Sequence, residues 1–172
     1  MTGNTIRFKR WRLMTGATEQ LTAARTLDDI LEILRSSGRA ILRSDGVTVV
    51  RREGDEVLYV GEDAIAPLWA GQRFPIRTCI SGIAMMQRET VVIPDIRLDP
   101  RVPHDAYQST FVASMAMAPI GVGRPVAAIG AYWRSARPIE HDALVLLDML
   151  AKAAGAQLER IADHGQAGRL AP

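Results

Sequence analysis

The chain has 172 residues, of which 48% are hydrophobic and 23% charged, and this length suits one domain that buries its core without disulfides or a structural metal. The 21 basic and 19 acidic residues give a net charge of +2, which argues against a surface built to neutralise many phosphates, so nucleic acid is not expected as a partner. A single cysteine, no signal-peptide core and no apolar run of about 20 residues predict a cytoplasmic protein without a membrane span.

The first 16 residues carry a basic cluster in which charged and apolar side chains alternate: Arg7, Lys9, Arg10 and Arg12. We interpret residues 1–16 as a basic arm that is solvated or packs on a partner subunit, and assign no site to it. Residues 17–162 are expected to form the domain. Residues 163–172, with two glycines, a proline and little apolar content, are expected to form a flexible tail or linker.

Helical periodicity begins near Ala17 and restarts after Thr26, which stands where a capping residue is expected. The second segment places four apolar side chains at i, i+3, i+4 and i+7: Leu27, Ile30, Leu31 and Leu34. This stripe is wide enough to cover a sheet. The helix is expected to end before Asp45.

Six segments have the composition of β-strands. Residues 47–51 with 56–60, and 112–120 with 124–133, are predicted to form hairpins, and residues 73–76 an edge strand. Val91, Val92 and Ile93 form a short β-branched run that Pro94 ends. The alanines and the glycine of the second hairpin indicate central strands covered closely on both faces. The sequence therefore predicts an α+β domain with an antiparallel sheet of about six strands.

Thr78 is expected to cap a short helix that precedes residues 91–93 and runs to about Arg88. From Pro94 to Asp105, three prolines and three aspartates favour turns over regular structure. The loop that follows holds His104, Tyr107 and Phe111. Because loops of this length inside a compact domain are often functional, we expect this one to wall a pocket.

The last helix is expected to begin near Ile139. Six apolar side chains follow it at alternating steps of three and four residues: Leu144, Leu147, Ala151, Ala154, Leu158 and Ile161. This is a short heptad seam, and the helix has more apolar surface than one contact with a sheet requires. We predict a homodimer joined through this helix and the helices that contain Leu21 to Leu34.

Four short motifs in this order resemble the ligand-side half of a GAF domain: Ser81-Gly82, Ile93-Pro94-Asp95, Asp99-Pro100-Arg101, and Ser114 before Ala118-Pro119-Ile120. The resemblance covers roughly residues 17–162 and is closest to the sensor modules of bacterial histidine kinases and other signalling proteins. It implies a central antiparallel sheet, with the terminal helices on one face and the pocket loop with short helices on the other. It also implies a sensory or regulatory function beside an effector domain or kinase.

We expect a small, polar or planar ligand beneath the loop, bound by polar groups and apolar walls: Asp95, His104, Tyr107, Phe111 and Ile83. Ligand binding would shift the loop and, through the sheet, the packing of the terminal helices. The alternative is a ligand-free dimerisation module whose own side chains fill the pocket. A metal held by His104 with aspartates is not expected, because turn formation explains those aspartates more simply.

An enzyme that depends on Cys79 is a further alternative, since a thiol at a helix N-terminus has a lowered pKa and is reactive. Against it, a lone cysteine is commonly buried, and no histidine is tied to this one by a sequence pattern. The GAF lineage that reduces free methionine sulfoxide uses several cysteines, and bilin-binding relatives attach their chromophore to a cysteine that residues 102–107 lack. We therefore expect neither catalysis nor a covalently bound bilin.

Overall fold

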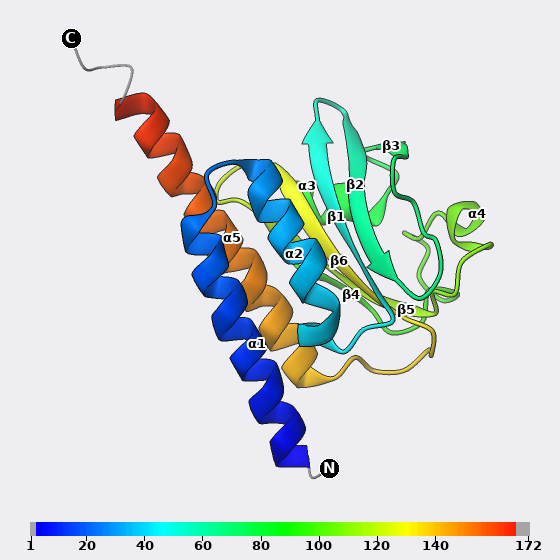
Figure 1. The fold of residues 1–172 in the computed structure, drawn as a ribbon. Helices are drawn as coiled ribbons and strands as arrows, with labels where there is room; N and C mark the ends of the chain where they lie inside the picture. Colours follow the sequence, from blue (N-terminus) through cyan, green and yellow to red (C-terminus); the bar gives the residue numbers. More distant parts are fainter. Residues whose placement is uncertain (1–2, 168–172) are drawn as a thin grey trace.

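The computed structural model describes residues 3–167. Their strands form one six-stranded antiparallel sheet in the order β3-β2-β1-β6-β5-β4. Three long helices cover one face of the sheet, and short helices and loops cover the other (Figure 1). The predicted α+β architecture is confirmed.

The described residues form six strands and five helices. The strands are β1 (Gly46–Glu53), β2 (Glu56–Ala64), β3 (Arg73–Pro75), β4 (Val91–Ile93), β5 (Ser114–Ile120) and β6 (Ala127–Trp133). The helices are α1 (Gly3–Ala23), α2 (Leu27–Leu42), α3 (Ile80–Gln87), α4 (His104–Tyr107) and α5 (His141–Ala167). The six strand segments predicted from composition are therefore present. The second hairpin was expected to form two central strands. Strand β6 is central, whereas β5 lies next to the edge strand β4.

Helix α2 begins as its sequence predicts. The backbone N–H of Asp29 donates to Thr26 Oγ1 at 3.0 Å, and the N–H of Thr26 donates to Asp29 Oδ2 at 3.0 Å, which forms a capping box. The helix ends at Arg43, which adopts the left-handed conformation with φ of 51°. In its apolar stripe, Ile30, Leu31 and Leu34 are fully buried and Leu27 is half-buried against the same core.

Helix α1 begins at Gly3, so the expected start at Ala17 was too late and residues 3–16 are not a separate arm. The start was placed too late because of Arg10, a charged residue that is buried in this structure. Its Nε donates to the Ile41 carbonyl oxygen at 2.8 Å, and its Nη1 lies 3.0 Å from both Glu140 carboxylate oxygens. Arg7 also pairs with Asp142 at 3.3 Å, so the basic segment binds to α2 and α5 of its own chain.

Helix α5 continues to Ala167, beyond the expected start of a tail at residue 163. It runs beside α1 in the same direction, and the two helices extend past the sheet at opposite ends (Figure 1). Residues 168–172 of the expected tail lie outside the described residues.

The heptad seam of α5 faces mostly inward. Leu147, Ala151 and Ala154 are buried in the core between the helices and the sheet, whereas Leu144, Leu158 and Ile161 are half-buried. The seam therefore packs on the domain's own core, and the homodimer joined through these helices stays a prediction. Among residues 3–167, none of the helices combines the length and apolar composition that crossing a bilayer requires.

Leu147→Glu should lower the free energy of unfolding by at least about 3 kcal/mol, because it places an unpaired carboxylate in the fully buried core. Ala162→Glu, which adds the same charge to an exposed position of α5, should cost less than about 1 kcal/mol. Urea denaturation followed by circular dichroism measures both. Equal losses would contradict the inward packing of the seam.

Candidate functional site

The space beneath the loop is occupied by aromatic side chains of the protein itself. Trp69 lies at the centre of this aromatic cluster, with ring centroids 4.6 Å from Tyr107, 5.5 Å from Tyr132 and 5.6 Å from Tyr59. Phe74 joins it through an edge-on contact with Tyr59 at 5.5 Å. These rings come from β2, β3, β6, α4 and the connector after β2, so the cluster joins the sheet to the loop. Such edge-on and tilted contacts stabilise beyond the area they bury.

Very little open space remains within the cluster. The cavity there has a volume of about 10 Å³, which is no more than one water molecule needs. Its walls are aromatic and apolar side chains with one thiol: Tyr59, Trp69, Phe74, Cys79, Pro103, Ala106 and Tyr107. A ligand of metabolite size would have to displace at least one of these side chains.

The three buried tyrosine hydroxyls all have partners. The hydroxyl of Tyr132 lies 2.8 Å from Thr48 Oγ1, and that of Tyr59 lies 3.4 Å from Ser81 Oγ. The hydroxyl of Tyr107 donates to Met115 Sδ at 3.4 Å. Burial raises the pKa of each phenol well above its ordinary value, so all three are neutral.

Backbone contacts fix the connector that carries Trp69. The Glu62 carboxylate accepts hydrogen bonds at 2.9 Å from the N–H groups of Leu68, Trp69 and Ala70. The indole Nε1 then donates to the Ala106 carbonyl oxygen at 2.9 Å. The connector therefore holds α4 in place, and α4 holds Tyr107.

The residues predicted for the pocket separate into two groups. Tyr107 is part of the aromatic cluster, and Phe111 and Ile83 are half-buried against the same core. His104, the first residue of α4, is exposed, and Asp95 lies in the loop beside Arg97. The structure thus brings three of the five together. As ligand contacts, all five stay predictions.

The aspartates of the loop serve its conformation. Asp95 Oδ1 accepts from the Arg97 backbone N–H and Nε at 3.0 Å, and Oδ2 accepts from Nη2 at 2.7 Å. Asp99 holds Arg101 in the same way, at 2.9, 3.0 and 2.7 Å. These arginines lower the pKa of both carboxyl groups. Among residues 3–167, no group of three or more His, Cys, Asp or Glu side chains could hold a metal ion.

Cys79, not Thr78 as predicted, caps helix α3. Its Sγ accepts from the Gly82 N–H at 3.4 Å and lies 3.4 Å from Ser81 Oγ. The thiol is buried, and burial raises its pKa, which opposes the activation expected at a helix N-terminus. Gly82 is required here because a side chain would collide with the Ile76 carbonyl oxygen. The Ser81-Gly82 motif thus seats α3 tightly on the chain that follows β3.

Sequence reasoning missed the part played by Tyr59, Tyr132 and Glu62. Tyr59 and Tyr132 lie on different strands, and their meeting depends on the strand order. A signal was present for Glu62, since one carboxylate shortly before a turn-rich connector can accept backbone N–H groups. That signal is too common to single out a site.

Comparison with protein families matches residues 24–159 to the GAF domain. A comparison with curated protein sequences finds no match. Among solved structures, the chain is similar to the GAF domain of a phosphoenolpyruvate-protein phosphotransferase from Coxiella burnetii, with TM-score 0.77 and 14% identity over 93% of this chain and 98% of that one.

Two further structures are also similar. One is a free methionine-R-sulfoxide reductase from Neisseria meningitidis, in complex with its substrate, with TM-score 0.75 and 16% identity over 90% of this chain and 91% of that one. The other is the chromophore-binding domain of a bacteriophytochrome from R. palustris, with TM-score 0.71 and 17% identity over 90% of this chain and 62% of that one. At these identities the likeness shows the fold alone.

Removal of the Tyr107 ring should open the pocket. Tyr107→Ala is expected to lower the free energy of unfolding by about 3 kcal/mol or more, and p-cresol, which has the shape of the lost side chain, should restore part of it. Tyr107→Phe keeps the ring and loses one weak hydrogen bond, so it should cost about 1 kcal/mol or less and gain nothing from p-cresol. Thermal denaturation with and without p-cresol measures both effects. Stabilisation of the unaltered protein by p-cresol would contradict the filled pocket.

Proposed function

The chain belongs to the GAF domain family, and we propose that it is a homodimeric regulatory module of a signalling protein, in which the layer of α1, α2 and α5 carries the signal. Structures with this fold include domains of a phosphotransferase, a bacteriophytochrome and a methyl-accepting chemotaxis protein. In such a role the module would act on an attached or separate effector, such as a kinase. The single, free and buried cysteine suits a cytoplasmic setting.

One observation carries the dimer. The two outer helices expose large apolar side chains although the core beneath them is complete: on α1, Phe8 is 67% exposed, Leu13 39% and Trp11 36%, and on α5, Met149 is 37% exposed. Aromatic residues and methionine are enriched where subunits meet. Because α1 and α5 run side by side and in parallel, one surface formed by both helices can pair with its copy about a two-fold axis. This replaces the inward-facing seam as the expected contact.

The filled pocket supports a module that needs no bound ligand. The rings of the aromatic cluster leave about 10 Å³, and their hydroxyls are already paired. We therefore favour the dimerisation module over the small-molecule sensor. The rigid sheet would then act as a spacer that fixes the angle of the outer helices.

A ligand sensor is the second candidate, and the chemistry of the buried groups favours it. Tyr59 and Cys79 line the cavity beside Tyr107, and Ser81 Oγ lies 3.4 Å from both the Tyr59 hydroxyl and the Cys79 thiol. Helix α4 spans His104–Tyr107 and has no side-chain cap, so a ligand that displaced it would have to replace the Trp69 hydrogen bond and the contacts of the Tyr107 ring. It would exchange the Tyr107 ring for its own planar group.

We further propose that the module is not an enzyme. The reductase with a similar fold acts on methionine sulfoxide, but the Cys79 thiol here is buried, has a raised pKa and serves as a helix cap. A thiolate nucleophile needs the opposite environment.

Native mass spectrometry of the freshly purified protein tests the proposal. We expect twice the chain mass with no additional small molecule. The double variant Trp11→Glu with Met149→Glu should be monomeric, because it places like charges in the outer-helix contact. Leu98→Glu, which alters an 82% exposed apolar residue of the loop, should stay dimeric.

A monomer at micromolar concentration would contradict the dimer. A dimer carrying extra mass that is lost on denaturation would instead establish the sensor.

A further inference from the structure

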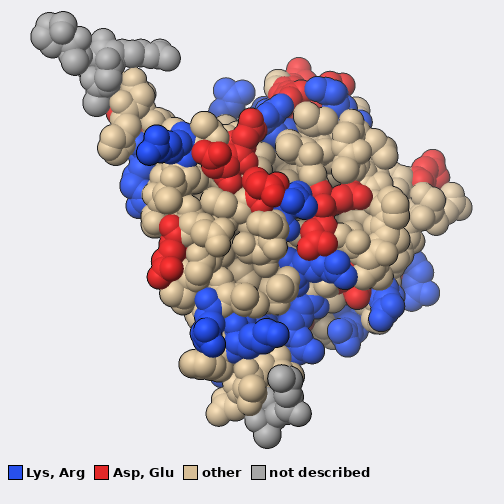
Figure 2. Space-filling model, in the orientation of Figure 1, with Lys and Arg blue, Asp and Glu red and all other residues tan. Residues whose placement is uncertain are grey.

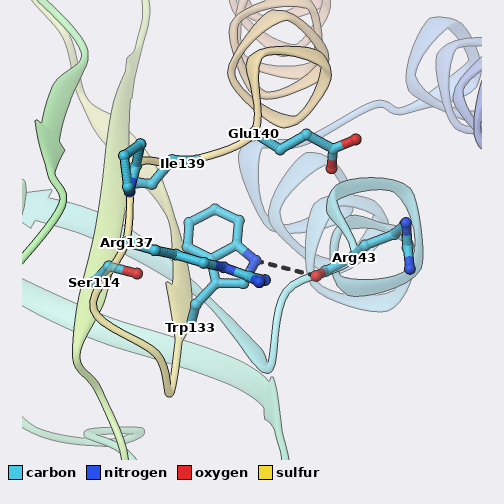
Figure 3. A pocket seen from close by; sticks show the side chains of 7 residues that line it. Arg43, Ser114, Trp133, Arg137, Ile139 and Glu140 are labelled. Atoms are coloured by element: carbon cyan, nitrogen blue, oxygen red, sulfur yellow. Dashed lines mark hydrogen bonds between the residues drawn. The ribbon is translucent and has the colours of Figure 1, made fainter.

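A cleft of about 370 Å³ lies on the helical side of the sheet, away from the aromatic cluster. The end of α2, the first residue of β5, the last residue of β6 and the segment before α5 enclose it, through Arg43, Ser114, Trp133, Arg137, Pro138, Ile139 and Glu140. The space is ample for a small metabolite. In Figure 3, Arg137 reaches toward the end of α2 past Trp133, while Arg43 projects from α2 on the far side and Glu140 extends from the start of α5.

The cations of this cleft are uncompensated. Among residues 3–167, Arg43 and Arg137 have no carboxylate within ion-pair distance. Glu140 is the one acidic residue of the lining, and its carboxylate is held at 3.0 Å by Arg10. Three guanidinium groups against one carboxylate leave an excess of two positive charges. Figure 2 shows Lys and Arg side chains gathered across this end of the molecule, where α1 begins.

Neighbouring acidic groups do not cancel this charge. Asp142 pairs with Arg7 at 3.3 Å, and Asp45 lies 3.8 Å from Arg134. Two carbonyl oxygens at the end of α2, which would repel an anion, are also engaged. Arg10 donates to the Ile41 oxygen, and the Trp133 indole Nε1 donates to the Arg43 oxygen at 3.0 Å (Figure 3).

The remaining polar groups of the lining hold the frame. The Ser114 hydroxyl donates to the Ser135 carbonyl oxygen at 2.9 Å, and the Trp133 indole N–H donates to the Arg43 carbonyl oxygen. Arg43 and Arg137 keep free guanidinium donors, whose fork matches phosphate and carboxylate oxygens. Arg137 already lies across the cleft, whereas the Arg43 side chain projects on the far side in Figure 3 and would turn toward a bound anion. The amino-terminal end of α5, which follows Glu140, adds a further positive potential.

We propose that this cleft binds a small oxyanion, the phosphate or carboxylate group of a metabolite, between Arg43 and Arg137. The bound anion would bridge the end of α2 to the segment before α5. Arg10 joins α1 to this same junction, so the anion would stabilise the layer that we propose to carry the signal. The site lies on the opposite face of the sheet from the aromatic cluster, and anion binding does not depend on the dimer.

The indole N–H of Trp133 reports on the site, because it bonds to the backbone of Arg43. We would titrate the full chain with inorganic pyrophosphate and, separately, with malonate, at constant ionic strength set with sodium chloride. Trp133→Phe assigns the indole signal in the proton–nitrogen spectrum. A saturable shift with either anion is expected, and the anion that binds more tightly identifies phosphate or carboxylate as the recognised group.

Arg137→Gln and Arg43→Asn should each weaken binding by about tenfold or more. Asparagine is chosen at position 43 because it tolerates the left-handed conformation there. Arg77→Gln removes an exposed arginine outside the cleft and should leave the affinity unchanged. All three variants alter exposed side chains, so their thermal midpoints should match the unaltered protein.

Two results would overturn the proposal. One is the lack of a saturable shift at millimolar concentrations of both anions. The other is a loss of affinity in Arg77→Gln equal to that in Arg137→Gln, which would show general attraction to a basic surface.

Discussion

The position of the Trp69 indole determines how the loop side of this protein is built. Its ring contacts Tyr59, Tyr107 and Tyr132, and its N–H holds the backbone of α4. Glu62 fixes the connector that presents it. Strand β2, strand β6 and helix α4 therefore all contact this one side chain. The space beneath the loop is filled as a direct consequence.

The two faces of the sheet are connected through neighbouring residues of β6. Tyr132 points into the aromatic cluster and contacts Thr48 of β1, whereas Trp133 packs in the helical core and bonds to the end of α2. Gly130 makes room for the Tyr132 ring, since a side chain there would meet its hydroxyl. Adjacent residues of β6 thus contact the loop side through Tyr132 and the end of α2 through Trp133.

Periodicity and capping predicted much of the fold, because α2, the two hairpins and α5 depend on local sequence. The start of α1 was missed since Arg10, a charged residue by composition, is buried by pairing with groups 31 and 130 residues away. Periodicity also identified the apolar face of α5, but it does not distinguish the protein's own core from a partner's. At the site, Tyr107 could be predicted because it lies in the proline-rich loop. The contact between Tyr59, Trp69 and Tyr132 could not be predicted without knowing the order of the strands in the sheet. Asp95 and His104 were singled out by residue type, and the structure uses Asp95 to hold Arg97 and leaves His104 exposed.

Spectrophotometric titration of the phenols tests the filled pocket most directly, because the chain has three tyrosines and all belong to the aromatic cluster. Their pKa values are raised in the folded state, so the contribution of the three phenols to folding stability should be constant below about pH 10 and fall above it, where the unfolded chain ionises first. We predict that tyrosinate absorbance appears only together with alkaline unfolding monitored by circular dichroism. A phenol that ionises reversibly near pH 10 in the folded protein would show that the cluster is open to solvent, and would contradict this account.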